Sequence, residues 1–97
     1  MVIAVLDHVA HCNTSADGDA LYVALRRALA LNAHVTVSFA GVHDVPSSFI
    51  NASIVRLVED HGIDAVKARL SIQDVGGQVG DMIRRCVRNA SRTPELA

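Results

Sequence analysis

The chain has 97 residues, of which 51% are hydrophobic and 20% are charged. This composition supports one small folded domain and excludes a largely disordered chain. Nine Lys and Arg residues against ten Asp and Glu, with one Tyr, two Phe and no Trp, argue against a dedicated nucleic-acid binder, which needs a basic surface or stacking aromatics.

The N-terminal residues carry no recognisable targeting signal. Met1 leads directly into the apolar run 2–6 without the basic flank of a secretory signal. No apolar stretch of the sequence reaches the roughly 20 residues that a membrane-spanning helix needs. Cys12 and Cys86 lie far apart and are expected to be free thiols. We therefore expect a cytoplasmic protein that does not enter a membrane.

The first half of the chain predicts a strand, a helix and a second strand. The run 2–6 is short and rich in β-branched residues, which favours a strand. Turn residues at 13–19 offer helix N-caps, and an apolar stripe at helical spacing then continues to about Asn32. Residues 34–40 alternate between apolar and polar, which predicts a second strand that ends at Gly41. The stripe of the first helix consists of Leu21, Ala24, Leu25, Ala28 and Leu29.

The second half repeats this order. One long amphipathic helix is predicted from Ser47 or Ser48 to Gly62, a residue that suits a helix C-terminus. Residues 63–69 fit either a helical turn or the approach to a strand, and 70–75 alternate like a third strand. After a pair of glycines, the clearest helical stripe of the chain follows. It consists of Val79, Met82, Ile83, Cys86, Val87 and Ala90.

Three strands that alternate with three helices predict an α/β fold in βαβαβα order. We expect right-handed crossovers and a small, mainly parallel sheet of three to four strands with helices packed on it. A single domain is expected over residues 1–92, with a flexible tail over 93–97. So small a sheet has exposed edges, and a further strand near 8–14, a partner protein or a second copy in a homo-oligomer would cover one of them.

The most unusual segment is the serine pair Ser47–Ser48, which stands between Pro46 and the apolar face of the second helix. Ligands of parallel sheets gather where strands end and helices begin. A serine at this point can cap the helix, or it can carry a phosphate, which adds about −1.5 to −2 charges. His43 and Asp44 also permit a catalytic serine, although the Gly-x-Ser-x-Gly elbow is missing.

A second cluster contains His8, His11 and Cys12, which are residue types that ligate metals. Their spacing matches no paired zinc pattern, so we favour a polar connection after the first strand and expect no metal and no cofactor. The alternative is a small metal-dependent or hydrolytic enzyme that uses these residues or His43.

The last predicted helix follows a glycine-rich run and carries four arginines. The glycine-rich run 76–81 lacks the lysine and hydroxyl residue of a phosphate-binding loop, so we expect a connector. The four arginines form a basic patch, and as cations they complement the negative, C-terminal end of the helix dipole. They are Arg84, Arg85, Arg88 and Arg92.

A family resemblance rests on three consecutive features. They are Val-Thr-Val-Ser-Phe-Ala-Gly-Val at 35–42, Pro-Ser-Ser-Phe-Ile-Asn at 46–51, and the long helix that follows. With these features, the segment from Val35 to Ala90 resembles the STAS-like family of small bacterial domains. That family is related to the STAS domains of anti-sigma factor antagonists.

The resemblance implies a function and a set of site residues. In anti-sigma factor antagonists, one hydroxyl of an Asp-Ser-Ser/Thr-Gly-like motif is phosphorylated by an anti-sigma factor that is also an ATPase-type serine kinase. Ser48 matches the phosphoacceptor and Ser47 the residue before it, while Pro46 and Phe49 replace the aspartate and the glycine. The chain is thus expected to be a non-enzymatic regulatory module whose partner is such a kinase or an anti-sigma factor. The implied partner-binding residues are Pro46, Ser47, Ser48, Phe49, Asn51 and Ala52.

Overall fold

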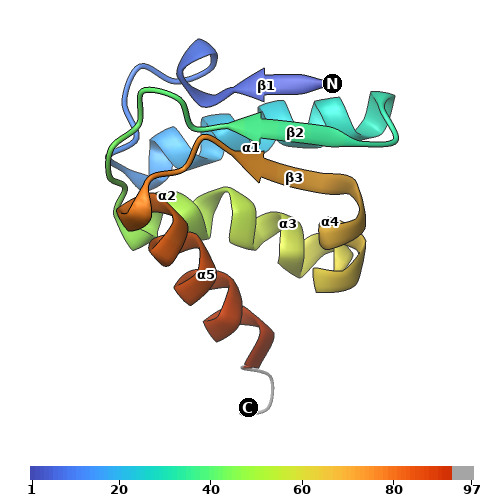
Figure 1. The fold of residues 1–97 in the computed structure, drawn as a ribbon. Helices are drawn as coiled ribbons and strands as arrows, with labels where there is room; N and C mark the ends of the chain where they lie inside the picture. The colour runs from blue at the N-terminus through green and yellow to red at the C-terminus, as the bar shows by residue number, and fades with distance from the viewer. Residues whose placement is uncertain (93–97) are drawn as a thin grey trace.

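The protein is an α/β domain built on a small sheet (Figure 1). The computed structural model describes residues 1–92, with side chains through residue 90, so the tail predicted at 93–97 lies outside the described residues. Strands β1 (Val2–Ala4), β2 (Val35–Ser38) and β3 (Leu70–Gln73) form a three-stranded, all-parallel sheet in the order β1-β2-β3. The helices are α1 (Ser15–Leu31), α2 (Ser47–Ala52), α3 (Ile54–His61), α4 (Ile63–Arg69) and α5 (Gly77–Arg92).

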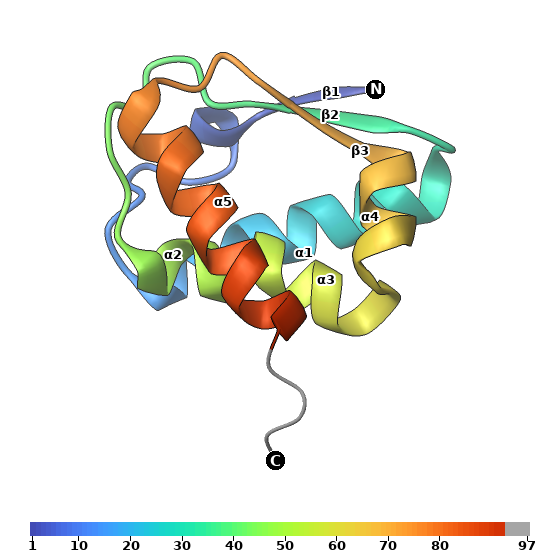
Figure 2. The ribbon, with the colours of Figure 1, turned by 60° about the horizontal axis from the view of Figure 1, so that its bottom comes forward.

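The helices lie together on one side of the sheet (Figure 2). Alternate strand residues point toward them: Ile3, Val37 and Ile72 share one register row, and the first two are buried. The neighbouring row ends in Val2, whose side chain is 63% exposed. The predicted α/β class and the alternating order are therefore confirmed, with a sheet that is covered on one face.

The first strand is shorter than predicted. It ends at Ala4, and Val5–Asp7 form a 3-10 helix, η1. Residues 8–14 contain no strand, so the fourth strand that we considered there is absent and the sheet of the described residues has three strands. Both β1 and β3 are consequently edge strands within residues 1–92.

The single long helix predicted from the serine pair to Gly62 is wrong, because the chain breaks at Ser53 into α2 and α3. Ser53 has φ −117° and ψ −83°, and its buried hydroxyl donates a hydrogen bond of 2.8 Å to the carbonyl oxygen of Phe49. Back-bonding of this kind competes with the helical ladder and bends a helix. The ambiguous residues 63–69 form a helix, α4.

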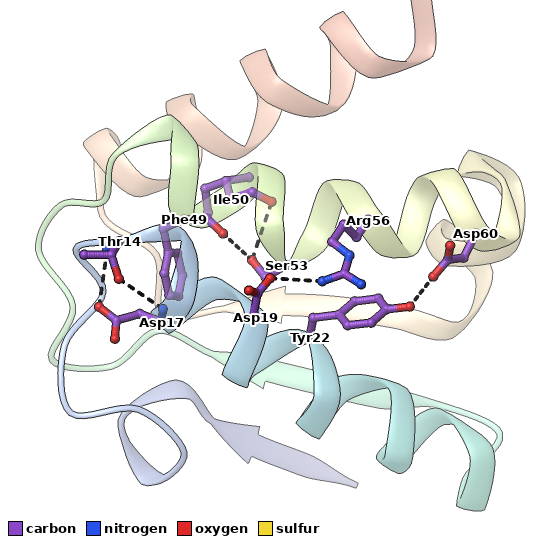
Figure 3. Close-up of polar contacts among 9 residues, drawn as sticks. All are labelled: Thr14, Asp17, Asp19, Tyr22, Phe49, Ile50, Ser53, Arg56 and Asp60. Atoms are coloured by element: carbon purple, nitrogen blue, oxygen red, sulfur yellow. Dashed lines mark hydrogen bonds and ion pairs between the residues drawn. The ribbon is translucent and has the colours of Figure 1, made fainter.

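Close packing of α1 on α2 depends on Gly18. A Cβ atom at this position would lie 2.5 Å from the carbonyl oxygen of Phe49 and 2.8 Å from the Cβ of Ala52. Only a glycine therefore allows the two backbones to approach this far. Thr14 and Asp17 start α1 with a reciprocal capping box (Figure 3).

Farther along α1, a polar cluster ties the helix to α3 (Figure 3). The Tyr22 hydroxyl donates a hydrogen bond to Asp60, and the guanidinium of Arg56 lies 3.9 Å from the centre of the tyrosine ring. Arg56 also forms an ion pair of 3.0 Å with Asp19. These contacts position α3, and α2 before it, against α1. None of the helices described within residues 1–92 is long and apolar enough to cross a membrane.

Candidate partner-binding site

The serine pair follows a loop, residues 39–46, that leaves the carboxyl end of β2. Val42 and Val45 anchor this loop in the core with 8% and 2% exposure. Gln78, in the first turn of α5, holds the backbone of Val45 in two directions. Its side-chain oxygen accepts a bond of 2.9 Å from the Val45 N–H, and its amide group donates one of 3.2 Å to the Val45 carbonyl. The backbone just before the serines is thus tied to α5.

The beginning of the same loop is tied to Asp74, the residue that follows β3. The hydroxyl of Ser38 donates a hydrogen bond of 2.7 Å to the carboxylate of Asp74 and accepts one of 3.2 Å from the N–H of Ala40. Asp74 has a positive φ of 60°, which an aspartate tolerates better than most residues. Since both ends of the loop are held, the position of α2 relative to the sheet is well defined.

Ser47 and Ser48 are the first two residues of α2, and both are exposed. The N-cap position belongs to Pro46, which has no side-chain capping bond, so the interpretation of a capping serine is wrong. Within residues 1–92, neither serine hydroxyl forms a hydrogen bond, and in particular none joins them to His43 or Asp44. The described residues therefore display two unbonded hydroxyls and do not assemble a catalytic triad.

The remaining residues of the expected partner surface divide into two groups. Asn51 is exposed and Pro46 is half-buried, so both are accessible beside the serines. Phe49 and Ala52, with 0% and 9% exposure, belong to the core instead. The resemblance implies them as partner-binding residues, but both are buried at the contact of α2 with α1, where the Phe49 carbonyl and the Ala52 methyl lie against Gly18.

A groove of about 560 Å³ runs from the start of α2 toward the end of α5, and we call it the α2–α5 groove. Ser47 and Asn51 lie on one wall and Arg85 on the other, with Glu59 beyond them, while Ser48 lies outside. The two serines therefore have different surroundings although they are neighbours. The groove is lined by Ser47, Asn51, Val55, Glu59, Met82, Arg85, Cys86, Asn89 and Ala90.

The His and Cys residues near β1 do not form a metal site. His11 and Cys12 line a pocket of about 360 Å³ together with His43 and Asp44, whereas His8 lies in a different pocket beside α1. Among the residues that the structure describes, no three His, Cys, Asp or Glu side chains are placed to hold one ion.

Both cysteines are free and buried. Burial raises the pKa of the Cys12 thiol, and the nearby carboxylate of Asp17 raises it further. Burial also raises the pKa of Cys86, although Arg85 opposes this shift. A raised pKa keeps a thiol protonated, which is unfavourable for a nucleophile or a metal ligand.

Sequence reasoning missed three residues that build the site. Gly18 gave no signal, because it falls in the segment 13–19 that the pattern assigns to a turn, before the apolar stripe begins. Gln78 bonds to a backbone 33 residues away, and the bond of Ser53 to the Phe49 carbonyl four residues earlier does not show in the apolar pattern.

Comparison with known proteins bears on the same part of the chain. A family model described as a STAS-like domain of unknown function (DUF4325) matches residues 17–79, more than half of the sequence. The matched span contains β2, the serine pair and β3. No curated protein and no solved structure matched the chain. Because the family model covers more than half of the sequence, including the serine pair and two of the three strands, the chain belongs to the STAS-like family.

Proposed function

We propose that this protein is a non-enzymatic regulatory module that binds a partner protein through the start of α2. The observation that carries the proposal is a pair of exposed hydroxyls that form no hydrogen bond within the described residues. They follow Val45, whose N–H and carbonyl both bond to Gln78. Ser47, Ser48 and Asn51 form the accessible part of this surface, with Pro46 at its edge. A surface that is already ordered loses little conformational entropy when a partner docks.

Phosphorylation of Ser48 would switch this contact. Ser48 is exposed to a kinase and lies outside the α2–α5 groove, which contains Arg85. A phosphate on Ser48 would therefore face the partner rather than a cation of that groove. Its added charge of about −1.5 to −2 would repel an acidic or apolar partner surface.

The class of partner follows from the family relationship. Anti-sigma factor antagonists, to which STAS-like domains are related, act on an ATPase-type serine kinase or anti-sigma factor, and we propose a partner of that class. Burial raises the pKa of the Cys12 thiol, which disfavours this residue as a nucleophile, since a protonated thiol reacts poorly.

Affinity capture from the native cell tests the proposal. We expect the wild type and Ser48→Ala to retain the same ATPase-type partner and Ser48→Asp to retain about tenfold less, the effect of roughly 1.4 kcal/mol of repulsion. Mass spectrometry of the protein isolated from those cells should find phosphate on Ser48.

A matched control is Ser15→Asp, which adds the same charge at an exposed serine in the first turn of α1, whose side chain has no hydrogen bond within residues 1–92. It should leave capture unchanged, and urea denaturation should show that both Asp variants keep the stability of the wild type within about 0.5 kcal/mol. Equal capture of the partner by Ser48→Ala and Ser48→Asp would contradict the switch.

A further inference from the structure

A second groove lies on the other side of α5, and it is lined mainly by apolar side chains. It has a volume of about 510 Å³, and its walls come from α3, α4, β3 and α5. Figure 2 shows these four elements around one side of the molecule. We call it the α4–α5 groove and define its apolar lining by Ile54, Val58, Val66, Ile72, Ile83 and Val87.

The rim of the α4–α5 groove carries only positive charge. Lys67 lies on the α4 side and Arg84 and Arg88 on the α5 side, and none of the lining residues is acidic. Arg84 pairs with Asp81, a neighbour on α5. Within the described residues, Lys67 and Arg88 form no ion pair, so the apolar lining lies between two uncompensated cations on opposite walls.

The dimensions of the groove distinguish a small ligand from a docked helix. Its lining covers residues 54–58 of α3, 63–67 of α4 and 83–88 of α5, which is only about one turn of the first two helices. A docked amphipathic helix uses anchors at i, i+3, i+4 and i+7 and needs a longer groove. The volume instead falls within the roughly 300–1,000 Å³ of small-molecule sites.

We propose that the α4–α5 groove binds a long-chain fatty acid, with the alkyl chain on the apolar lining and the carboxylate between Lys67 and Arg88. An alkyl chain matches the lining, because it gains from apolar burial and offers no polar group that would need a partner. A carboxylate matches the rim, because a charge-assisted hydrogen bond to a cation is stronger than a neutral one. The site is separate from the serine pair and does not depend on the function proposed above.

Calorimetric titration of the full chain with dodecanoate, below its micelle concentration, tests the proposal. We expect saturable binding with one ligand per chain. Chain length should matter, with roughly fourfold tighter binding for each added methylene that is buried between octanoate and dodecanoate. Binding should weaken as ionic strength rises, since the rim cations are exposed and therefore screened.

Two arginines of α5 supply a matched pair of variants. Arg88 lines the α4–α5 groove, whereas Arg85 lines the α2–α5 groove, and both are exposed. The double variant Lys67→Gln, Arg88→Gln should weaken dodecanoate about tenfold and leave dodecanol unchanged. Arg85→Gln should alter neither ligand by more than twofold. All of these substitutions are at exposed positions, so thermal unfolding should confirm an intact fold.

Three results would overturn the proposal. A titration without saturable binding of dodecanoate would exclude the site. An equal loss on Arg85→Gln, or no loss in the double variant, would show that the rim of this groove does not bind the carboxylate. Binding of an acidic amphipathic peptide at this groove, without competition from dodecanoate, would assign the groove to a protein partner instead.

Discussion

Val45 illustrates how single side chains control the serine site at the residue scale. Its side chain is buried, and both of its backbone polar groups bond to the amide of Gln78. A loop residue before a short helix would otherwise fray readily, because it has few buried contacts of its own. The long-range amide pair replaces the ladder bonds that a strand or helix would provide.

Replacement of Gln78 by Ala should therefore loosen this loop. The loss of two hydrogen bonds is expected to lower the free energy of unfolding by about 1–2 kcal/mol and to speed hydrogen exchange at the Val45 N–H. Exchange measured by NMR gives the local effect. Gln73→Ala is the control, because that glutamine is exposed on β3 and its side chain has no hydrogen bond within residues 1–92. Unchanged exchange at Val45 would contradict the role given to Gln78.

The lowered pKa of Asp17 predicts a contribution to the free energy of unfolding that is lost in acid. The hydrogen bond from the Asn13 N–H is the main cause that lowers the pKa of the Asp17 carboxyl. The hydroxyl and the N–H of Thr14 lower this pKa further. A lowered pKa in the folded state means that Asp17 stabilises the protein above its unfolded pKa of about 3.9, and that this contribution is lost as pH falls through the folded value.

Urea denaturation of the wild type and Asp17→Asn from pH 7 to pH 2 measures this effect. The difference in free energy of unfolding should stay constant down to about pH 5 and then shrink toward zero below about pH 4. Asp7→Asn is the control, since this exposed carboxylate has no hydrogen bond in the described part of the chain. A difference that persists undiminished at pH 2 would argue against a role for the carboxylate charge.

At the scale of elements, the relation between α1 and α2 decides where the serines lie. The two helices approach so closely that the Phe49 carbonyl and the Ala52 methyl occupy the space above Gly18. The break at Ser53 then turns the chain, so that α3 can meet Tyr22 and Arg56 can stack on its ring (Figure 3).

Gly18→Ala should separate these helices. Alanine favours a helix over glycine by about 1 kcal/mol, but forcing a methyl group into a closely packed contact costs about 1–3 kcal/mol, so a net destabilisation is expected. Chemical denaturation measures the net change, and partner capture should fall with it because α2 moves. Gly76→Ala is the control, because a Cβ there would meet no atom within 4 Å. A Gly18→Ala protein as stable as the wild type would refute the tight contact.

At the scale of the whole molecule, the sheet divides the domain into two unlike faces. The helices cover one face, while the other presents exposed side chains such as Val2, Ser71 and Gln73. Parallel sheets are usually covered on both faces, so this arrangement is unusual among them. The two grooves beside α5 add further accessible surface on the helical side.

The sequence by itself determined the order of elements, because period-2 and period-3.6 patterns of apolar residues reflect which side chains must leave water. It also identified the serine pair and the family. Tertiary structure alone decided that Phe49 is buried while Ser48 is exposed, that Ser53 breaks the helix, and that Gln78 holds Val45. The burial of Phe49 and the bond of Gln78 to Val45 depend on contacts between residues distant in the chain. The break at Ser53 depends on whether its hydroxyl bonds to the Phe49 carbonyl, and the apolar pattern of the sequence does not encode either outcome.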